Sequence, residues 1–200
     1  MAYVSMKPGT LLSPVPAVMV SCASENDRPN IVTVAWAGTV CSQPPTVSIS
    51  LKPERFSHHI IRDSGEFVIN LVGEDQLKAM DYCGVRSGRD EDKFASCGLI
   101  PLQVGAMDFA PAIDGCPLYL ACKTRQVLSL GCHDMFIGRI TDVGIREDLV
   151  GPEGGIDLKK AKLVAYSHGL YQRLGDVLGF FGYSVAAPDV LERRMKELKR

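Results

Sequence analysis

Several features are missing from this chain of 200 residues, and each absence removes a class of protein. No apolar run approaches the roughly 18 residues that a membrane-spanning helix needs, so we expect no membrane partner. The formal net charge is −1, which gives no attraction to nucleic acid. Residues 1–20 have no basic segment ahead of an apolar core, so we expect no signal peptide and predict a cytoplasmic location.

Common nucleotide-binding and nucleophile motifs are also missing. The chain has no G-x-x-x-x-G-K-[ST], no G-x-G-x-x-G between a strand and a helix, no G-x-S-x-G and no H-E-x-x-H. Its histidines show no metal-ligand spacing, since adjacent helical residues point about 100° apart. We therefore predict no metal site from His58, His59, His133 and His168.

Cysteine is the unusually frequent residue, with seven copies. The number is odd and no C-x-x-C pair occurs, which disfavours a zinc ribbon, an iron–sulfur cluster and a thioredoxin-type dithiol. Without a secretion signal, reduced thiols that pack as small apolar residues are the expected state. The positions are Cys22, Cys41, Cys83, Cys97, Cys116, Cys122 and Cys132.

The strand pattern dominates a composition that is 46% hydrophobic and 22% charged, as in a globular protein. Residues 31–38 are apolar or small on both faces, which predicts a strand covered on both sides. Residues 46–53 alternate, with Val47, Ile49 and Leu51 inward. Further strands are predicted at 17–24, 66–72 and 162–167, and a long hairpin at 116–130 and 135–145 around the turn 131–134.

Short helices are predicted between these strands. We expect helices at 57–64, with Ser57 as N-cap and Gly65 as stop, at 74–84, and at 90–98 with Asp90 as cap. A terminal helix is predicted at 188–200 with Asp189 as cap, whereas residues 168–184 are ambiguous. No regular βαβ alternation occurs, so we predict one mainly β domain over residues 1–200, an antiparallel barrel with helical insertions and a C-terminal helix.

Two polar segments are candidates for ligand binding. The predicted loop "AGTVCSQPP" could present backbone N–H groups and the hydroxyls of Thr39 and Ser42 to an anion, or it could be a surface turn. The segment "RSGRDEDKF" could bring Arg86, Arg89 and Lys93 to a phosphate, or it could be a solvated loop.

Two single residues allow similar alternatives. Trp36, the one tryptophan, is either a core residue or the neighbour of a flat ring. His133 in the hairpin turn is either an exposed turn residue or a donor and proton source at a site.

Taken together, these segments resemble the flavin reductase-like, FMN-binding split-barrel family, and within it the flavoredoxin-like branch. The resemblance runs from "PVPAVMVS" to "FFGYSV". It is carried by the stretch "NIVTVAWAGTVCSQPPTVSISLKPERFSHHIIRDSGEFVINL" and supported by "CGVRSGRDEDKF", "HDMFIGRITDV" and "YQRLGDVLGFFGYS".

The resemblance implies FMN as cofactor and a set of residues around it. Lys93 would reach the phosphate or ribityl side, His133 would approach from the hairpin turn as the catalytic group, and Tyr166 would supply an aromatic wall. Cys41 would tune the flavin or fill space beside it. The remaining positions implied to contact or flank the cofactor are Asn30, Trp36, Thr39, Ser42, Ser57 and Arg89.

The resemblance also implies what the protein does. The first hypothesis is an NAD(P)H-dependent flavin reductase, in which NADH or NADPH gives hydride to FMN and electrons pass to free flavin or another acceptor. The second is a flavoredoxin-like electron carrier that exchanges electrons with a redox protein. A bare FMN-binding or sensing module ranks third. Pyridoxamine-phosphate-oxidase-type chemistry is disfavoured, since no basic cluster is clearly devoted to a second phosphate. A homodimer is implied as well.

Overall fold

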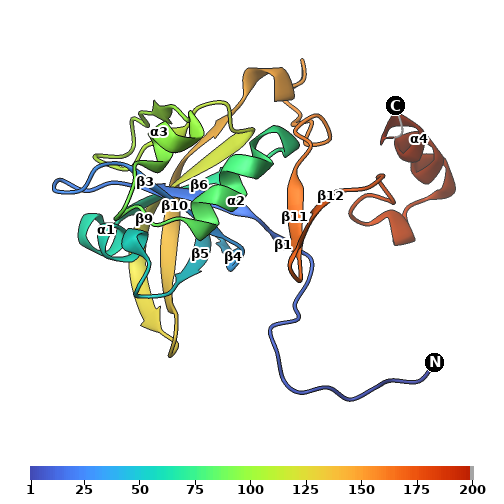
Figure 1. Ribbon diagram of the computed structural model, residues 1–200. Coiled ribbons are helices and arrows are strands. Elements are labelled where there is room, and N and C mark those ends of the chain that lie inside the picture. Colours follow the sequence, from blue (N-terminus) through green and yellow to red (C-terminus); the bar gives the residue numbers. More distant parts are fainter. Residues whose placement is uncertain (199–200) are drawn as a thin grey trace.

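A seven-stranded antiparallel sheet forms the body of the protein in the computed structural model, which describes residues 1–198 (Figure 1). Bulges between β9 and β10 interrupt the ladder and increase its curvature. The mainly β, antiparallel architecture predicted from the sequence is confirmed. The strands, in their order across the sheet, are β3 (Asn30–Val34), β2 (Val18–Cys22), β6 (Glu66–Leu71), β9 (Leu118–Ser129), β10 (Asp134–Ile145), β5 (Pro45–Leu51) and β4 (Ala37–Ser42).

Two small sheets complete the β structure. One contains β1 (Val15–Pro16), β11 (Val164–Ser167) and β12 (Leu170–Arg173), and the other contains β7 (Pro101–Leu102) and β8 (Ala112–Ile113). The ambiguous stretch 168–184 thus holds β12 and the first residues of the 3₁₀ turn η3 (Tyr183–Val185).

Four α-helices and two more 3₁₀ turns lie between or after the strands. None of the helices in residues 1–198 is long and apolar enough to cross a membrane. The last two residues of the helix predicted at 188–200 lie outside the described part. The helices are α1 (Phe56–Ser64), α2 (Leu77–Val85), α3 (Lys93–Cys97) and α4 (Pro188–Leu198), and the turns are η1 (Glu74–Gln76) and η2 (Glu147–Leu149).

The N-caps that we predicted for two internal helices, Ser57 and Asp90, are both displaced. The N-cap of α1 is Arg55, without a side-chain cap, whereas Ser57 lies inside the helix. The N-cap of α3 is Asp92, whose carboxylate accepts from the Ala95 N–H at 3.2 Å, so the prediction of Asp90 is wrong by two residues. Sequence alone does not separate neighbouring polar residues at a helix start. Gly65 ends α1 in the left-handed region, as predicted.

The segment around Trp36 differs most from expectation. The strand predicted at 31–38 ends at Val34 and resumes as β4 at Ala37, with a bend between them. The predicted loop 37–45 is wrong, because residues 37–42 pair with β5 as the edge strand of the sheet. An edge strand that faces solvent needs no apolar alternation, so its pattern resembles that of a loop.

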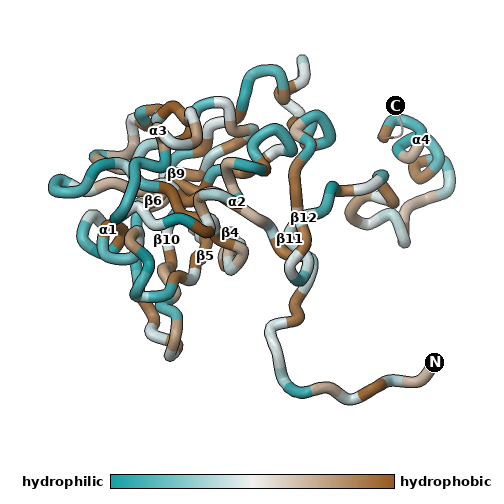
Figure 2. Tube along the Cα trace, viewed as in Figure 1, coloured by the Kyte–Doolittle hydropathy of each residue, from teal (hydrophilic) through white to brown (hydrophobic). Residues whose placement is uncertain are grey.

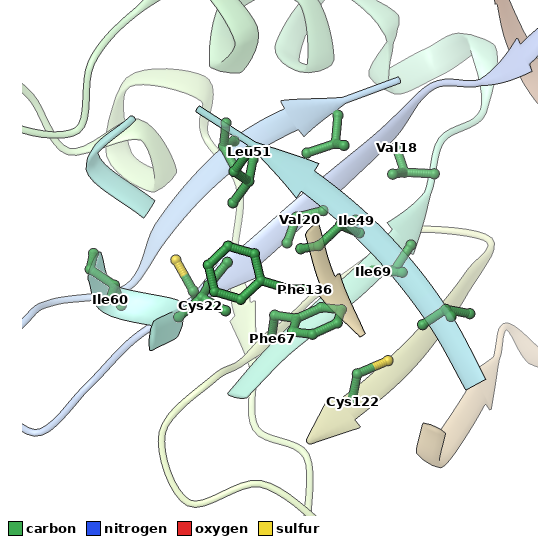
Figure 3. Close-up of a cluster of buried hydrophobic side chains, with 14 residues drawn as sticks. Val18, Val20, Cys22, Ile49, Leu51, Ile60, Phe67, Ile69, Cys122 and Phe136 are labelled. Atoms are coloured by element: carbon green, nitrogen blue, oxygen red, sulfur yellow. The ribbon is translucent and has the colours of Figure 1, made fainter. Parts of the chain in front are cut away.

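The main core lies inside the curved sheet (Figure 3). Val47, Ile49 and Leu51 are buried there, which confirms the inward face predicted for β5. Phe67 and Phe136 fill its centre. Gly138 allows this packing, since a Cβ at that position would lie 2.5 Å from Cζ of Phe67.

A second core covers the opposite face of β2 and β3. Ile31 packs there with Met80 and Cys83 of α2 and Phe94 of α3, so β3 is covered on both faces as predicted. Burial raises the pKa of the Cys22, Cys83, Cys116 and Cys122 thiols to about 12. These four cysteines therefore pack as neutral apolar groups, as expected from the sequence.

Candidate functional site

Three adjoining cavities that share lining residues form one groove beside strands β3 and β5. The first measures about 340 Å³, the middle one about 120 Å³ and the third about 350 Å³. Val32, Lys52 and Arg55 line both the first and the middle cavity. Trp36 and Ser50 line both the middle and the third. We name the first cavity the cationic end and the third the apolar end.

The cationic end gathers positive side chains from three segments of the chain. Five cations face one carboxylate, Glu54, among the lining residues. Two arginines are anchored through one nitrogen each: Arg55 Nη1 donates to the Gly84 carbonyl at 3.0 Å, and Arg89 Nη1 donates to the Glu54 carbonyl at 2.9 Å. A guanidinium has five N–H donors, so each arginine retains donors for an anion. The five cations are Lys52, Arg55, Arg86, Arg89 and Lys93.

Lys93 forms the floor of this end and is 3% exposed. Its Nζ donates to the carbonyls of Ile31 and Cys83, both at 2.8 Å. Burial lowers the pKa of the Lys93 ammonium below its ordinary value. An ammonium has three donors, so one remains beyond these two bonds.

Two buried polar side chains lie beside Lys93. The Asn30 amide donates from Nδ2 to Ser57 Oγ at 2.8 Å, and both residues line the cationic end. The bond joins the first residue of β3 to the first turn of α1. It holds the helix start, with Arg55 and Phe56, at the groove.

The apolar end is built around Trp36, which is 41% exposed. Small residues, Ala35, Ala37 and Gly38, lie on either side of it in the sequence and line the same cavity. Leu12 of the N-terminal segment lines it as well. A half-exposed indole flanked by small residues is suited to a flat, largely apolar ligand group.

His133 lies in the middle of the groove. It ends the turn between β9 and β10 and lines the same cavity as Trp36 and Arg55. Its Nδ1 lies 3.2 Å from the thiol of Cys132, so Nε2 is the ring nitrogen free to meet a ligand.

The structure brings together six of the residues that the sequence suggested. Asn30, Ser57, Arg89 and Lys93 line the cationic end, His133 the middle, and Trp36 both the middle and the apolar end. They come from β3, α1, the segment before α3, the first residue of α3, the bend after β3 and the hairpin turn.

Four of the suggested residues lie elsewhere. Thr39, Cys41 and Ser42 are exposed on β4 and line none of the three cavities. Cys41 fills no buried space, and its thiol lies 3.3 Å from the Gln43 carbonyl. Tyr166 packs against Tyr171 with ring centroids 5.8 Å apart, and pairs across β1 and β11 with Val15, which lines the apolar end.

Sequence reasoning missed Lys52, Arg55 and Gly88 as lining residues. Lys52 and Arg55 are the first and last residues of the polar segment "KPER", and Gly88 lies between Arg86 and Arg89. A cluster of basic residues spaced by about 30 positions carries no local signal. The approach of α1 to the segment 85–89 creates the cluster.

The sequence model of the flavin reductase like domain matches residues 11–175, most of the chain. Among solved structures, a flavoredoxin of Desulfovibrio vulgaris (Miyazaki F) superimposes with a TM-score of 0.84 at 32% identity, over 90% of this chain and 97% of the other. An FMN-binding protein from Thermus thermophilus gives a TM-score of 0.72 at 25% identity, over 86% and 95%.

Curated relatives point the same way. The reductase component of a 4-nitrophenol 4-monooxygenase/4-nitrocatechol 2-monooxygenase from Rhodococcus opacus is 27% identical over 62% of this chain and 63% of its own length. Five of the curated relatives are matched over only 53% to 66% of their own length. The relationship therefore concerns the shared domain.

Proposed function

Because this chain belongs to the flavin reductase-like family, we propose that its groove binds FMN and that the protein is an oxidoreductase. One observation carries the proposal: a single groove has five cations at one end and an exposed tryptophan among small residues at the other. A dianionic phosphate fits the first end and a flat isoalloxazine ring fits the second. The split-barrel architecture of this family is the one observed.

The phosphate is held in this proposal by arginine forks and by the Lys93 ammonium. Arg55 and Arg89 are each anchored on one side, so they lose less side-chain entropy when an anion binds. Lys93 contributes its third N–H from the floor. Since five cations exceed the charge of one phosphate, the groove also favours a further anionic reactant.

The ring is held beside Trp36, with His133 at its edge. Bound FMN supplies the hydride and electron chemistry. The protein orients the ring with Trp36, lets backbone amides approach it through Ala37 and Gly38, and offers His133 Nε2 as a donor and proton source.

NADH or NADPH as electron donor is the first form of the proposal. The relative named as a monooxygenase reductase component supports it. The second form is an electron carrier that exchanges electrons with a redox protein, which the similarity to a flavoredoxin supports. Both forms use the same groove and differ in the reactant that approaches the ring.

The visible absorption spectrum of the purified protein tests the proposal directly. We expect flavin absorption bands at about 375 and 450 nm, either in the protein as isolated or after addition of FMN. Bleaching by NADH or NADPH under argon would select the reductase. If the protein is yellow and is bleached by a reduced redox protein but by neither nucleotide, the electron carrier is selected. A protein that stays colourless after addition of FMN contradicts the proposal.

We also propose a homodimer, because both ends of the described chain extend away from the body of the protein (Figures 1 and 2). Several of their apolar side chains are exposed. In the C-terminal segment Leu178 is 89% exposed and Phe181 104%. Helix α4 buries no residue. Burying such side chains against a second copy would release about 1.5–3 kcal/mol each.

Light scattering with size-exclusion chromatography tests the dimer. We expect the wild type at twice 21.7 kDa, and a Leu178→Glu/Phe181→Glu double variant shifted towards the monomer because two charges would enter the apolar contact. Ile100→Glu, at an exposed apolar position on the body, is the matched control and should leave the mass unchanged. A wild-type monomer, or a double variant that stays fully dimeric, contradicts this role of the C-terminal segment.

A further inference from the structure

A buried histidine connects helix α1 to the hairpin turn of the groove. His58 is 5% exposed, and its Nε2 lies 2.8 Å from Oδ2 of Asp134. Its ring packs edge-on against Phe136, with centroids 5.1 Å apart. A contact across 76 positions of sequence thus fixes the start of β10 to the third residue of α1.

Asp134 holds both sides of the turn at once. Its second carboxylate oxygen accepts from Ser129 Oγ at 2.8 Å, and Ser129 is the residue opposite Asp134 in the hairpin. The Leu130 N–H donates to the His133 carbonyl at 2.8 Å and closes the turn. Donation from Ser129 and His58 lowers the pKa of the Asp134 carboxyl, so it remains an acceptor at neutral pH.

The two elements joined by this pair are two walls of the groove. The start of α1 brings Arg55 and Ser57 to the cationic end, and the turn brings His133 to the middle. His58 follows Ser57, and Asp134 follows His133, in the sequence. Each member of the pair is therefore one peptide bond from a residue that lines the groove.

We propose that His58 and Asp134 are positioning residues that hold His133 at a fixed distance from the cationic end of the groove. The inference rests on the proposed function, because it assigns His133 to the bound flavin. A buried pair of this kind contributes little net stability compared with apolar packing of the same volume. Its geometry instead specifies one arrangement of two elements, as a site that must place a proton donor requires.

Three variants separate positioning from a general structural role. His58→Leu removes the bond to Asp134, whereas His58→Gln can keep it, because the glutamine amide nitrogen can take the place of Nε2. His59→Leu is the matched control: it removes a bond of the same kind, from His59 Nε2 to Asp27 at 3.3 Å, on the same helix but away from the turn.

Amide hydrogen exchange of the flavin-free protein gives the first measurement. The Leu130 N–H donates to the His133 carbonyl, so its exchange reports whether the turn stays closed. We expect this exchange to be about 10-fold faster in His58→Leu than in the wild type, and close to wild type in His58→Gln and His59→Leu. Unchanged exchange in a folded His58→Leu protein overturns the inference whether or not the protein binds flavin. If His58→Leu does not fold, Asp134→Asn, which keeps the shape of the side chain, replaces it.

Flavin binding and reduction give the second measurement. We expect His58→Leu to keep the FMN dissociation constant within about 3-fold and to slow reduction of the bound flavin by about 10-fold or more, towards the rate of His133→Ala. The FMN-induced shift of the His133 ring signals in NMR should also be lost, and His58→Gln should restore both. Wild-type rate and His133 shift in His58→Leu overturn the inference while FMN binding stands. A wild-type protein that binds no FMN contradicts the proposed function instead.

Discussion

Replacement of Lys93 by methionine is expected to lower the free energy of unfolding by about 2–4 kcal/mol and to weaken FMN binding by about 10-fold to 100-fold. Two charge-assisted bonds to the Ile31 and Cys83 carbonyls are lost, and methionine offers them no donor. Methionine also removes the desolvation penalty of a buried ammonium, which offsets part of this cost. This offset sets the lower limit of the expected loss of stability. The third N–H, which we assign to the phosphate, is lost as well.

Urea unfolding and FMN fluorescence titration measure the two effects. Lys52→Met is the control, because Lys52 lines the same cavity but is exposed and pairs with Glu54 at 3.6 Å. It should change stability by less than about 0.5 kcal/mol. A Lys93→Met protein that loses stability but binds FMN as tightly as the wild type would remove Lys93 from the site and leave it a structural residue.

The same substitution has a pH signature. Since burial lowers the pKa of Lys93 in the folded protein, the folded state binds fewer protons at this group than the unfolded chain does. Stability from this group therefore rises with pH between the lowered pKa and the ordinary value of 10.5. The stability advantage of the wild type over Lys93→Met should increase across that interval.

Gly88→Ala is expected to cost about 1–3 kcal/mol of stability and about 10-fold or more in FMN affinity. A Cβ at this position would lie 2.1 Å from Oδ1 of Asn30 and 2.8 Å from Cδ1 of Phe56. Either the segment 85–89 moves outward with Arg89, or Asn30 leaves its bond to Ser57. Both movements open the cationic end.

Gly105→Ala is the matched control, since a Cβ there would meet no atom within 4 Å. Thermal unfolding and FMN titration of the two variants should differ clearly. Equal FMN affinity of Gly88→Ala and the wild type would contradict this prediction, because it would show that the segment 85–89 can shift without changing the FMN site.

Periodicity made the core strands predictable. The alternation of residues 46–53 placed Val47, Ile49 and Leu51 inward, and the two apolar faces of 31–34 required cover on both sides. Such patterns follow from burial, because a buried position requires an apolar side chain and burial is therefore visible in the sequence. The helices were found for the same reason, although their caps moved by up to two residues.

The break at Trp36 was not predictable in this way. A continuous run of β-favouring residues gave no sign that β3 stops at Val34 and that β4 pairs elsewhere. Edge position decides it, because residues 37–42 face solvent and require no apolar face. The same exposure takes Thr39, Cys41 and Ser42 away from the groove, although their family positions suggested contact.

Apolar alternation and local motifs predicted the antiparallel β architecture and the family, because both are properties of residues close together in the sequence. The sequence also identified Trp36, His133 and Lys93 as candidate ligand-binding residues. The set of cations that share one cavity, and the contact of His58 with Asp134 across 76 positions, became evident in the folded structure alone. These contacts depend on how α1, the hairpin turn and the segment 85–89 approach one another. Contacts between segments that are distant in the sequence produce no periodic pattern in a single sequence.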